Sequence, residues 1–475
     1  MKSTLPKVLH PIGGAPLLGH AMRAASGAGA EQTVVVIRHQ RERVAAYVEE
    51  FNASAERPCT IADQDEIKGT GRAVECGLTA LAEDLTGTIV VTMGDVPLLS
   101  AETVTALTAA HVEASAAVTV VTSVLDDAKA YGRIVRDADG NVERIVEFKD
   151  ATEDERAITE INSGIYAFDA AVLRRELANV TTDNAQGEKY LTDVLQLARA
   201  TGGRVAAYVL SDLWQTEGVN DRVQLADLGK ELNRRTCERH MRAGVTIVDP
   251  ATTWIDVDVS IGQDTTVLPG TQLLGATSIG TEATIGPDVT LTDCEVGDGA
   301  EVKRAEGNLA VIGAGATVGP YSYLRPGTVL GARGKIGGFV ETKNTTIGQG
   351  AKVPHLTYAG DADIEAGANI GAGTIFANYD GVNKHRTRVG SHSFVGSNSV
   401  LVAPVEIADG AYVAAGSAVT DEVGPGQLAV ARGRQRNIDG WVEAQRAGTP
   451  TAAAAQAAAQ PPSPQTTPES SEDTQ

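Results

Sequence analysis

A six-residue periodicity is the feature that most constrains the fold of this chain. Between Ile255 and Val419, aliphatic side chains recur at every sixth position, in three phases separated by slips. The members are Ile255, Ile261, Val267, Leu273, Ile279, Ile285 and Leu291, then Ile312, Val318, Leu324, Leu330 and Ile336, then Val389, Val395, Leu401, Ile407, Val413 and Val419. A period of six matches neither a helix nor a long strand that returns in a hairpin. It predicts a parallel β-helix of hexapeptide repeats, with one inward aliphatic per short strand.

The first half of the chain has a different pattern, in which strand-like runs alternate with helical ones. The expected strands are Thr33–Ile37, Cys59–Ala62, Thr88–Met93, Ala117–Val124, Gly164–Phe168 and Val205–Leu210. One of the intervening helical segments is Gly187–Ala200, and a long helix is expected from Asn220 to Arg242. This alternation predicts an α/β, Rossmann-like domain with a largely parallel sheet, whose ligands bind beyond the carboxyl ends of the strands.

Composition excludes several functional classes and separates the end of the chain from the rest. The net charge of −21 argues against a nucleic-acid partner, and no apolar run approaches the length of a membrane span. Four scattered cysteines suggest reduced thiols in a cytoplasmic protein. From Gly448 onward Ala, Pro, Gln, Ser and Thr dominate, which predicts a disordered tail. The expected units are residues 1–219 (α/β domain), 220–244 (linker helix), 245–446 (solenoid) and 447–475 (tail).

Three local clusters in the first half have residue types suited to phosphate chemistry. Lys7 follows a proline near an expected βα loop, and Gly69-Thr70-Gly71 is a small turn that a ligand could approach closely. Asp95 ends a strand-like run. It is either an N-cap or turn residue, or a ligand for a Mg²⁺ ion that carries nucleotide phosphates. Lys7 is either an ordinary exposed lysine or a phosphate ligand.

Polar residues interrupt the six-residue repeat in the second half. His355 breaks the rhythm at residues 353–358, and an insertion at 371–388 contains Asn378, Tyr379 and Lys384. Insertions in solenoids gather on a binding face, although a solenoid can also be purely structural. His355 alone could be a packing histidine. The residues that favour a pocket for an anionic substrate around it are Arg325, Lys343, Tyr358 and Asn369.

Taken together, the motifs of the first half follow a known order. They are Leu5-Pro6-Lys7, Gly69-Thr70-Gly71, Gly94-Asp95, Tyr131-Gly132-Arg133-Ile134, Glu147-Phe148-Lys149-Asp150, Asn162-Ser163-Gly164-Ile165 and Gly218-Val219-Asn220. This is the order seen in sugar-nucleotide pyrophosphorylases. With the hexapeptide solenoid behind them, residues 1 to about 445 resemble the GlmU family, in which one chain is both N-acetylglucosamine-1-phosphate uridyltransferase and glucosamine-1-phosphate N-acetyltransferase.

The resemblance implies a left-handed β-helix, a cytoplasmic homotrimer and a role in making cell-wall precursors. Its co-substrates would be UTP and acetyl-CoA, with Mg²⁺ held by Asp95 and Asn220. The implied contacts of UDP-N-acetylglucosamine are Lys7, Gln64, Gly69, Thr70, Met93, Gly94, Asp95, Gly132, Glu147, Asn162 and Asn220. His355 would be the general base, and glucosamine-1-phosphate would contact Arg325, Lys343, Tyr358 and Asn369. The implied contacts of acetyl-CoA are Ala372, Asn378, Tyr379, Ser397, Ala415 and Arg432.

The start of the chain departs from the family pattern. The family opens with a buried strand and a glycine-rich loop of the form L-A-A-G-x-G-T-x-M, whereas this chain begins Met1-Lys2-Ser3-Thr4. We expect further residues upstream, and without the loop we expect crippled uridyl transfer because the triphosphate loses backbone N–H donors. Two alternatives follow, an enzyme that only transfers acetyl groups and a non-catalytic regulatory protein of the same architecture.

Overall fold

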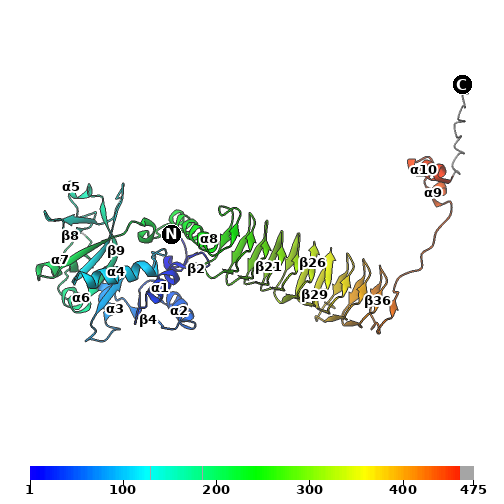
Figure 1. Cartoon of the computed structure of the whole chain (residues 1–475), viewed down its shortest axis with the longest axis horizontal. Helices are drawn as coiled ribbons and strands as arrows, with labels where there is room; N and C mark the ends of the chain where they lie inside the picture. The colour runs from blue at the N-terminus through cyan, green and yellow to red at the C-terminus, as the bar shows by residue number, and fades with distance from the viewer. Residues whose placement is uncertain (129, 185, 460–475) are drawn as a thin grey trace, which may run out of the picture.

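The computed structural model describes residues 1–128, 130–184 and 186–459 and has an elongated shape (Figure 1). An α/β domain lies at one end, and helix α8 (Arg222–Arg242) joins it to a straight solenoid. Two short helices, α9 (Trp441–Gln445) and α10 (Pro450–Ala459), lie beyond the far end of the solenoid. None of the helices in the described part of the chain is long and apolar enough to cross a membrane.

The α/β domain contains helices on both sides of its sheets. The helices are η1 (Lys7–Leu9), α1 (Leu17–Gly27), α2 (Arg41–Asn52), α3 (Thr70–Leu78), α4 (Ala101–Glu113), α5 (Glu153–Arg156), α6 (Ala170–Leu177), α7 (Asp193–Ala200) and η2 (Leu213–Thr216). The strands are β1 (Pro11–Ile12), β2 (Ala15–Pro16), β3 (Val34–Ile37), β4 (Thr60–Asp63), β5 (Thr88–Val91), β6 (Val118–Val124), β7 (Arg133–Arg136), β8 (Val142–Val146), β9 (Glu160–Asp169) and β10 (Val205–Val209). Each strand expected from the sequence is therefore present, with its ends shifted by a few residues.

The main sheet is mixed, so the expectation of a largely parallel sheet is wrong. Its strand order is β10-β6-β9-β7-β8, and β5 also pairs with β9. Strands β10 and β6 are parallel, but β9 runs antiparallel to β5, β6 and β7, and β7 runs antiparallel to β8. Strands β3 and β4 form a separate parallel pair. The pattern of apolar residues in the sequence identifies strands but not their directions. The sheet is mixed because β9 runs opposite to the strands beside it.

Helix α7 is shorter than the sequence predicted. It begins at Asp193 instead of Gly187. Gly187 has a φ of +63° and donates its amide to the Asn184 carbonyl at 3.1 Å, which makes a turn. A left-handed backbone at this glycine cannot continue into a right-handed helix, so the helical pattern starts later.

Helix α8 closes one end of the solenoid. The Asp221 side chain caps its start by accepting from the Val223 and Gln224 amides, each at 2.9 Å. Cys237 on α8 is fully buried against the aliphatic core of the solenoid. The helix therefore belongs physically to both domains, and it covers apolar side chains that the first coil would otherwise expose to water.

The solenoid is a prism whose coils each contribute three strands. One side is an eleven-stranded parallel sheet, and a seventeen-stranded sheet covers the remaining sides. The eleven strands are β11 (Thr246–Ile247), β14 (Thr266–Val267), β17 (Thr284–Ile285), β20 (Glu301–Val302), β23 (Thr317–Val318), β26 (Lys335–Gly338), β28 (Lys352–His355), β30 (Asn369–Ile370), β33 (Phe394–Val395), β36 (Tyr412–Val413) and β38 (Leu428–Ala429). The parallel β-helix of hexapeptide repeats expected from the six-residue period is the architecture of residues 246–429, and it is consistent with the left-handed form that the family resemblance implies.

The larger sheet contains the strands that carry two of the four predicted sugar-phosphate residues, Lys343 and Tyr358. Its members are β12 (Trp254–Ile255), β13 (Ser260–Ile261), β15 (Gln272–Leu274), β16 (Ser278–Ile279), β18 (Thr290–Thr292), β19 (Glu295–Val296), β21 (Ala305–Asn308), β22 (Val311–Ile312), β24 (Ser322–Leu324), β25 (Thr328–Leu330), β27 (Glu341–Ile347), β29 (Tyr358–Ile364), β31 (Ile375–Ala377), β32 (Thr387–Val389), β34 (Val400–Val402), β35 (Val405–Ile407) and β37 (Ala418–Val419). Strands β27 and β29 each run through a corner of the prism, which is one reason that the six-residue phase slips in this region.

The core of the solenoid is the periodic aliphatic set. All of its members are at most 4% exposed, except Ile261, which is partly buried at one end. The inward placement predicted from the spacing is therefore confirmed. The aliphatic side chains of successive coils pack against one another inside the prism. The outward side chains between them therefore occupy fixed positions on its sides and corners.

The C-terminal segment differs from the predicted disorder over residues 450–459, which form α10. Its sequence is almost entirely alanine, the residue with the highest helix propensity. The low-complexity composition predicted disorder for the whole segment and did not take account of the helix propensity of its alanines. The rest of the predicted tail, residues 460–475, lies outside the described residues.

Candidate active sites

Lys7 brings together the two residues predicted to hold a metal ion. Its ammonium forms an ion pair with Asp95 and donates to Asn220 Oδ1 at 3.3 Å. Asp95 follows β5, and its backbone carbonyl accepts from the Val219 amide at 3.1 Å, which ties this loop to the start of α8. A carboxylate oxygen of Asp95 and the amide oxygen of Asn220 thus both contact the ammonium group of Lys7.

This donor set fits Mg²⁺ bound together with substrate. The ion prefers oxygen ligands and commonly uses one or two carboxylates plus phosphate oxygens and water. No group of three or more His, Cys, Asp or Glu side chains that could hold a metal occurs within the described residues. A magnesium ion beside Asp95 and Asn220 would therefore take its other ligands from phosphate and water, and Lys7 would be freed to contact phosphate.

A second group of predicted residues surrounds the start of α3. Gln64 Nε2 donates to the Gly69 carbonyl at 3.2 Å, and the Thr70 hydroxyl accepts from the Leu191 amide at 3.2 Å. Gly69 has a φ of +116°, and a Cβ there would overlap the backbone of Lys189. Only glycine fits this close approach, so the turn before α3 is shaped by the chain that lies across it.

A third group lies where β7, β8 and β9 meet. The Asn162 amide donates to the Gly132 carbonyl at 2.9 Å, and the side-chain oxygen of Asn162 accepts from the Tyr166 hydroxyl at 2.9 Å. Glu147 is half-buried, and burial, assisted by the charges of Asp150 and Asp193, raises its pKa. A carboxyl group with a raised pKa in such a place is suited to hydrogen bonding with a polar ligand.

Met93 and Gly94 pack behind the Asp95 loop. The Met93 methyl lies 3.3 Å from where a Cβ would stand on Gly164, and such a Cβ on Gly94 would lie 3.3 Å from Leu18. These contacts make the loop compact. The structure thus gathers the predicted nucleotide-site residues into three neighbouring groups, of which only the Lys7 group contains a direct charge contact.

In the solenoid, most of the residues predicted for acetyl-CoA follow one edge of the prism. His355 ends β28, and its carbonyl accepts from Gly373 at 3.1 Å, beside Ala372. The same ladder continues through Ala372 and Ser397, whose carbonyls accept from Asn398 at 2.7 Å and Gly416 at 2.8 Å. Ala415 adjoins Gly416, and Arg432 lies in the coil beyond, its Cδ 3.9 Å from where a Cβ would stand on Gly416. With coils about 4.8 Å apart, this edge is long enough for an extended pantetheine arm.

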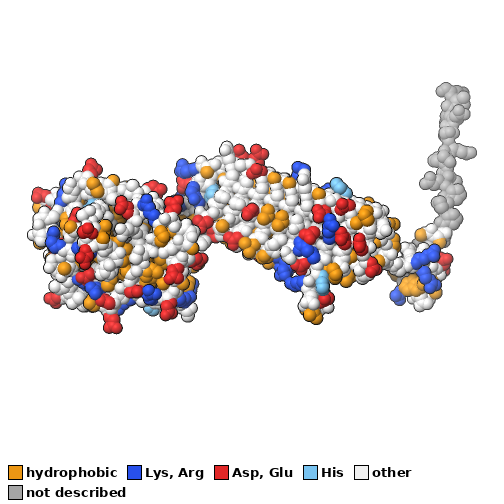
Figure 2. Space-filling model, turned by 90° about the horizontal axis from the view of Figure 1, so that it is seen from below, with side chains coloured by type: hydrophobic (Ala, Val, Ile, Leu, Met, Phe, Trp, Pro, Cys, Tyr) orange, Lys and Arg blue, Asp and Glu red, His pale blue; other side chains and the backbone are white. Residues whose placement is uncertain are grey.

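The residues predicted for the sugar phosphate lie on the side that follows this edge. Strand pairing aligns Tyr323, Glu341 and Tyr358 in one column, and Lys343 pairs with Gly360 in the next one. Arg325 follows β24 and forms an ion pair with Glu341 at 2.8 Å. A neighbouring ammonium, that of Lys384 in the inserted loop, lowers the pKa of Lys343. Lys and Arg side chains are grouped on this distal half of the solenoid (Figure 2).

Two predicted residues are placed differently from the others. Asn369 is on β30 in the eleven-stranded sheet, where it pairs with Lys352 and Phe394, so it lies on the other side of the edge that holds His355. Tyr379 is 60% exposed in the inserted loop and donates its hydroxyl to the Gly381 carbonyl at 2.6 Å. Within one chain, Tyr379 is bonded to its own loop and not to the other predicted residues.

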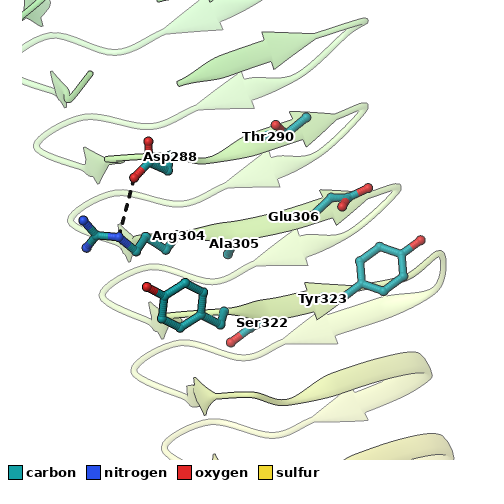
Figure 3. Close-up of a pocket in the computed structure, with 8 residues that line it drawn as sticks. Asp288, Thr290, Arg304, Ala305, Glu306, Ser322 and Tyr323 are labelled. Atoms are coloured by element: carbon teal, nitrogen blue, oxygen red, sulfur yellow. Dashed lines mark ion pairs between the residues drawn. The ribbon is translucent and has the colours of Figure 1, made fainter. Parts of the chain in front are cut away.

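A shallow pocket occurs earlier on the solenoid (Figure 3). It is lined by Asp288, Thr290, Arg304, Ala305, Glu306, Tyr321, Ser322 and Tyr323. An ion pair of 3.5 Å joins Arg304 to Asp288 at one end. None of the predicted site residues lines this pocket. Tyr323 is two strands before Tyr358 in the same column, so the pocket borders the side of the prism that carries the predicted sugar-phosphate residues.

Sequence reasoning missed the acidic partners of the cationic residues. Glu341 pairs with Arg325, and Asp361 accepts from Asn378 at 2.5 Å. Their positions depend on which residues face each other in successive coils. The six-residue phase is broken here, so no signal in the sequence would have aligned these residues before the structure was known.

The fold and these two sites define a class, a nucleotidyltransferase domain fused to a hexapeptide-repeat solenoid. Residues 2–257 match the family model described as Nucleotidyl transferase. The bifunctional protein GlmU of Pseudarthrobacter chlorophenolicus is 59% identical over 460 residues, which cover 96% of this chain and 93% of that protein. The bifunctional protein GlmU of Micrococcus luteus is 57% identical over 467 residues, which cover 96% and 94%. The chain belongs to the family of bifunctional GlmU proteins, as the order of its motifs predicted.

Proposed function

We propose that this protein acetylates glucosamine-1-phosphate with acetyl-CoA on its solenoid and couples the product to UTP on its α/β domain. The products of the second step are UDP-N-acetylglucosamine and pyrophosphate. The observation that carries the proposal is the presence of two separate cationic sites, one around Lys7 and Asp95 and one around Arg325 and Lys343, in a chain of the GlmU family.

Acetyl transfer requires a base, an anchor for the phosphate and room for the thioester. His355 is exposed at the edge of the prism, and a neutral imidazole has a ring nitrogen that can accept a proton. It would take a proton from the substrate amine as the amine attacks the thioester carbonyl. Arg325 and Lys343 would bind the sugar phosphate, arginine as a fork and lysine as a point charge. The small residues Ala372 and Ala415 leave space along the edge for the pantetheine arm.

Uridyl transfer requires positioning and charge neutralisation more than a covalent nucleophile. The sugar phosphate would attack the α-phosphorus of UTP in line and release pyrophosphate. Asp95 and Asn220 would hold Mg²⁺, which neutralises phosphate charge when bound. Lys7 would then bind phosphate oxygens, since its ammonium already lies beside both metal ligands. Gln64, Thr70 and the groups around Asn162 would contact the nucleotide and sugar.

We also propose a homotrimer that shares its acetyl sites between subunits. Exposed apolar groups near the site support this assembly, among them Leu356, which is 62% exposed and follows His355. Tyr321 and Phe339, 57% and 62% exposed, stack at 5.2 Å on the same solenoid. A cytoplasmic location is supported by the four cysteines, which are all buried free thiols. The proposed units remain residues 1–219, 220–244, 245–446 and 447–475.

Two assays on the 475-residue chain test this function. Release of CoA thiol from acetyl-CoA with glucosamine-1-phosphate reports the first step, and release of pyrophosphate from UTP with N-acetylglucosamine-1-phosphate and Mg²⁺ reports the second. We expect His355→Asn to abolish only thiol release and Asp95→Asn to abolish only pyrophosphate release. Thiol release without pyrophosphate release would support the alternative of an acetyltransferase alone. Absence of both activities would support a regulatory protein and refute the proposal.

A further inference from the structure

Asp361 occupies an unusual position beside the candidate acetyl site. It lies within β29 where the strand turns a corner of the prism, with a φ of +50°. Its Oδ2 accepts from Asn378 Nδ2 at 2.5 Å, and its Oδ1 accepts from Asn344 Nδ2 at 2.7 Å. Asn344 sits at the equivalent corner of the preceding coil, with a φ of +46°. Asp361 therefore links the corner at Asn344 to Asn378 in the inserted loop.

The contact with Asp361 determines which way the Asn378 amide faces. An ionised carboxylate can only accept hydrogen bonds, so the side-chain nitrogen of Asn378 must point towards Asp361. The same nitrogen lies 3.4 Å from the Tyr358 hydroxyl, which occupies its second N–H. The amide oxygen makes no hydrogen bond within the described residues. It is left as an acceptor, although Asn378 itself is only 7% exposed.

Asp361 is ionised under the conditions in which the enzyme would work. Burial acts to raise its pKa, but the hydrogen bonds from Asn344 and Asn378 and the charges of Lys343 and Lys384 outweigh burial and lower it. The same carboxylate acts to raise the pKa of Lys343, against the effect of Lys384. One anion thus lies close enough to the ammonium groups of Lys343 and Lys384 to attract both of them.

We propose that Asp361 is a positioning residue for acetyl transfer. It holds the Asn378 amide with the oxygen free to accept a substrate N–H, and it offsets part of the positive charge of Lys343 and Lys384. The inference rests on the proposed acetyl transfer and deepens it. The N–H could come from the amine of the sugar or from an amide of the pantetheine arm, because both are donors of the same kind.

Asp361→Asn tests the inference in the full-length protein, because it keeps the size of the side chain while removing its charge and its acceptor-only character. We expect kcat for thiol release to fall about 10- to 100-fold, since small errors in positioning have effects of this size. The KM for glucosamine-1-phosphate should not rise, because the substitution removes a negative charge from the side of the site that would bind the phosphate. Pyrophosphate release should be unchanged. A merely structural role would lower both activities through loss of folded protein.

Asp363→Asn is the matched control, because Asp363 lies two residues along the same strand and pairs with Arg386 at 2.5 Å, away from Asn378. If Asp361→Asn behaves like Asp363→Asn while the wild-type protein is active, the inference is wrong. A raised KM for glucosamine-1-phosphate with unchanged kcat would also overturn it. A fall in kcat alone would assign the N–H to the sugar amine, and a fall with a raised KM for acetyl-CoA would assign it to pantetheine. A wild-type protein without thiol release would refute the proposed function itself.

Discussion

Asn233 on α8 makes two hydrogen bonds that join the linker helix to the first coil of the solenoid. Its side-chain nitrogen donates to the Thr253 carbonyl at 2.7 Å, and its oxygen accepts from the Ile255 amide at 2.9 Å. The residue is only 7% exposed. The substitution Asn233→Leu keeps a side chain of similar size and removes both bonds, so it leaves the Ile255 amide without a partner and the Thr253 carbonyl with only the weak thiol donor of Cys237 at 3.9 Å.

The cost can be worked from these two groups. A buried polar group that loses its partner costs about 1–3 kcal/mol, so the pair would cost about 2–6 kcal/mol. A chain with two domains does not unfold in one step, so a local change in free energy need not alter global unfolding. The lost free energy should instead make α8 and the first coil open locally more often. At about 1.4 kcal/mol per factor of ten, the lower limit corresponds to about a 25-fold loss of protection.

Native-state hydrogen exchange of the α8 amides measures this quantity directly. Lys230→Leu is the control, because Lys230 is exposed on the same helix and makes no side-chain hydrogen bond or ion pair with any residue that the structure describes. We expect the control to exchange like the wild-type protein. If Asn233→Leu changed the protection of α8 by less than about threefold, the two bonds would not hold the helix to the solenoid and the reasoning would be refuted.

Three further predictions concern charge. Lys343→Met should raise the KM for glucosamine-1-phosphate about tenfold or more, because a charge-assisted contact to phosphate is lost; an unchanged KM in steady-state kinetics would place the phosphate elsewhere. Asp95→Asn should remove the dependence of pyrophosphate release on Mg²⁺ along with the activity, and a magnesium titration that still saturates normally would exclude Asp95 as a ligand. Asp212 receives two bonds of 2.8 Å from Arg235, and these lower its pKa. Its folded pKa is below its unfolded value, so the stabilisation is present above about pH 4 and is lost as the pH falls through the folded pKa. Arg235→Gln should remove this acid sensitivity, as measured by hydrogen exchange of α8 at stepped pH.

The parts of the fold that could be predicted from the sequence are those that depend on a local period. The inward positions of Leu273, Ile336 and Leu401 follow from spacing alone, because each coil buries one aliphatic per side and every coil repeats the last. Helix α8 was also predictable, since its apolar positions and its cap are close together in the sequence. The direction of β9 was not, because strand pairing is a contact between distant residues.

In the candidate sites, too, residue types could be identified from the sequence, but contacts between distant residues could not. Lys7 and Asp95 were identifiable as residue types at suitable places, yet their ion pair joins residues far apart in the chain. The bond between Asp361 and Asn378 spans 17 residues, which is nearly one coil. Coil length varies where β27, β29 and the inserted loop interrupt the repeat. Without the register of these strands, the sequence could not show that the two side chains meet.

Along the edge from His355 to Arg432, successive corner residues are separated by one coil each. Positions on this edge therefore differ by whole numbers of coils. If the phosphate binds near Arg325 and the pantetheine arm lies along the edge through Ser397, as proposed, their separation is set by the number of coils between these residues and not by loop conformation. One coil more or less would move one ligand by about 4.8 Å relative to the other, which exceeds the separation of reacting atoms. On the proposed function, we expect added coils before Arg325 to leave acetyl transfer intact, and a coil added or removed between Arg325 and Ser397 to abolish it.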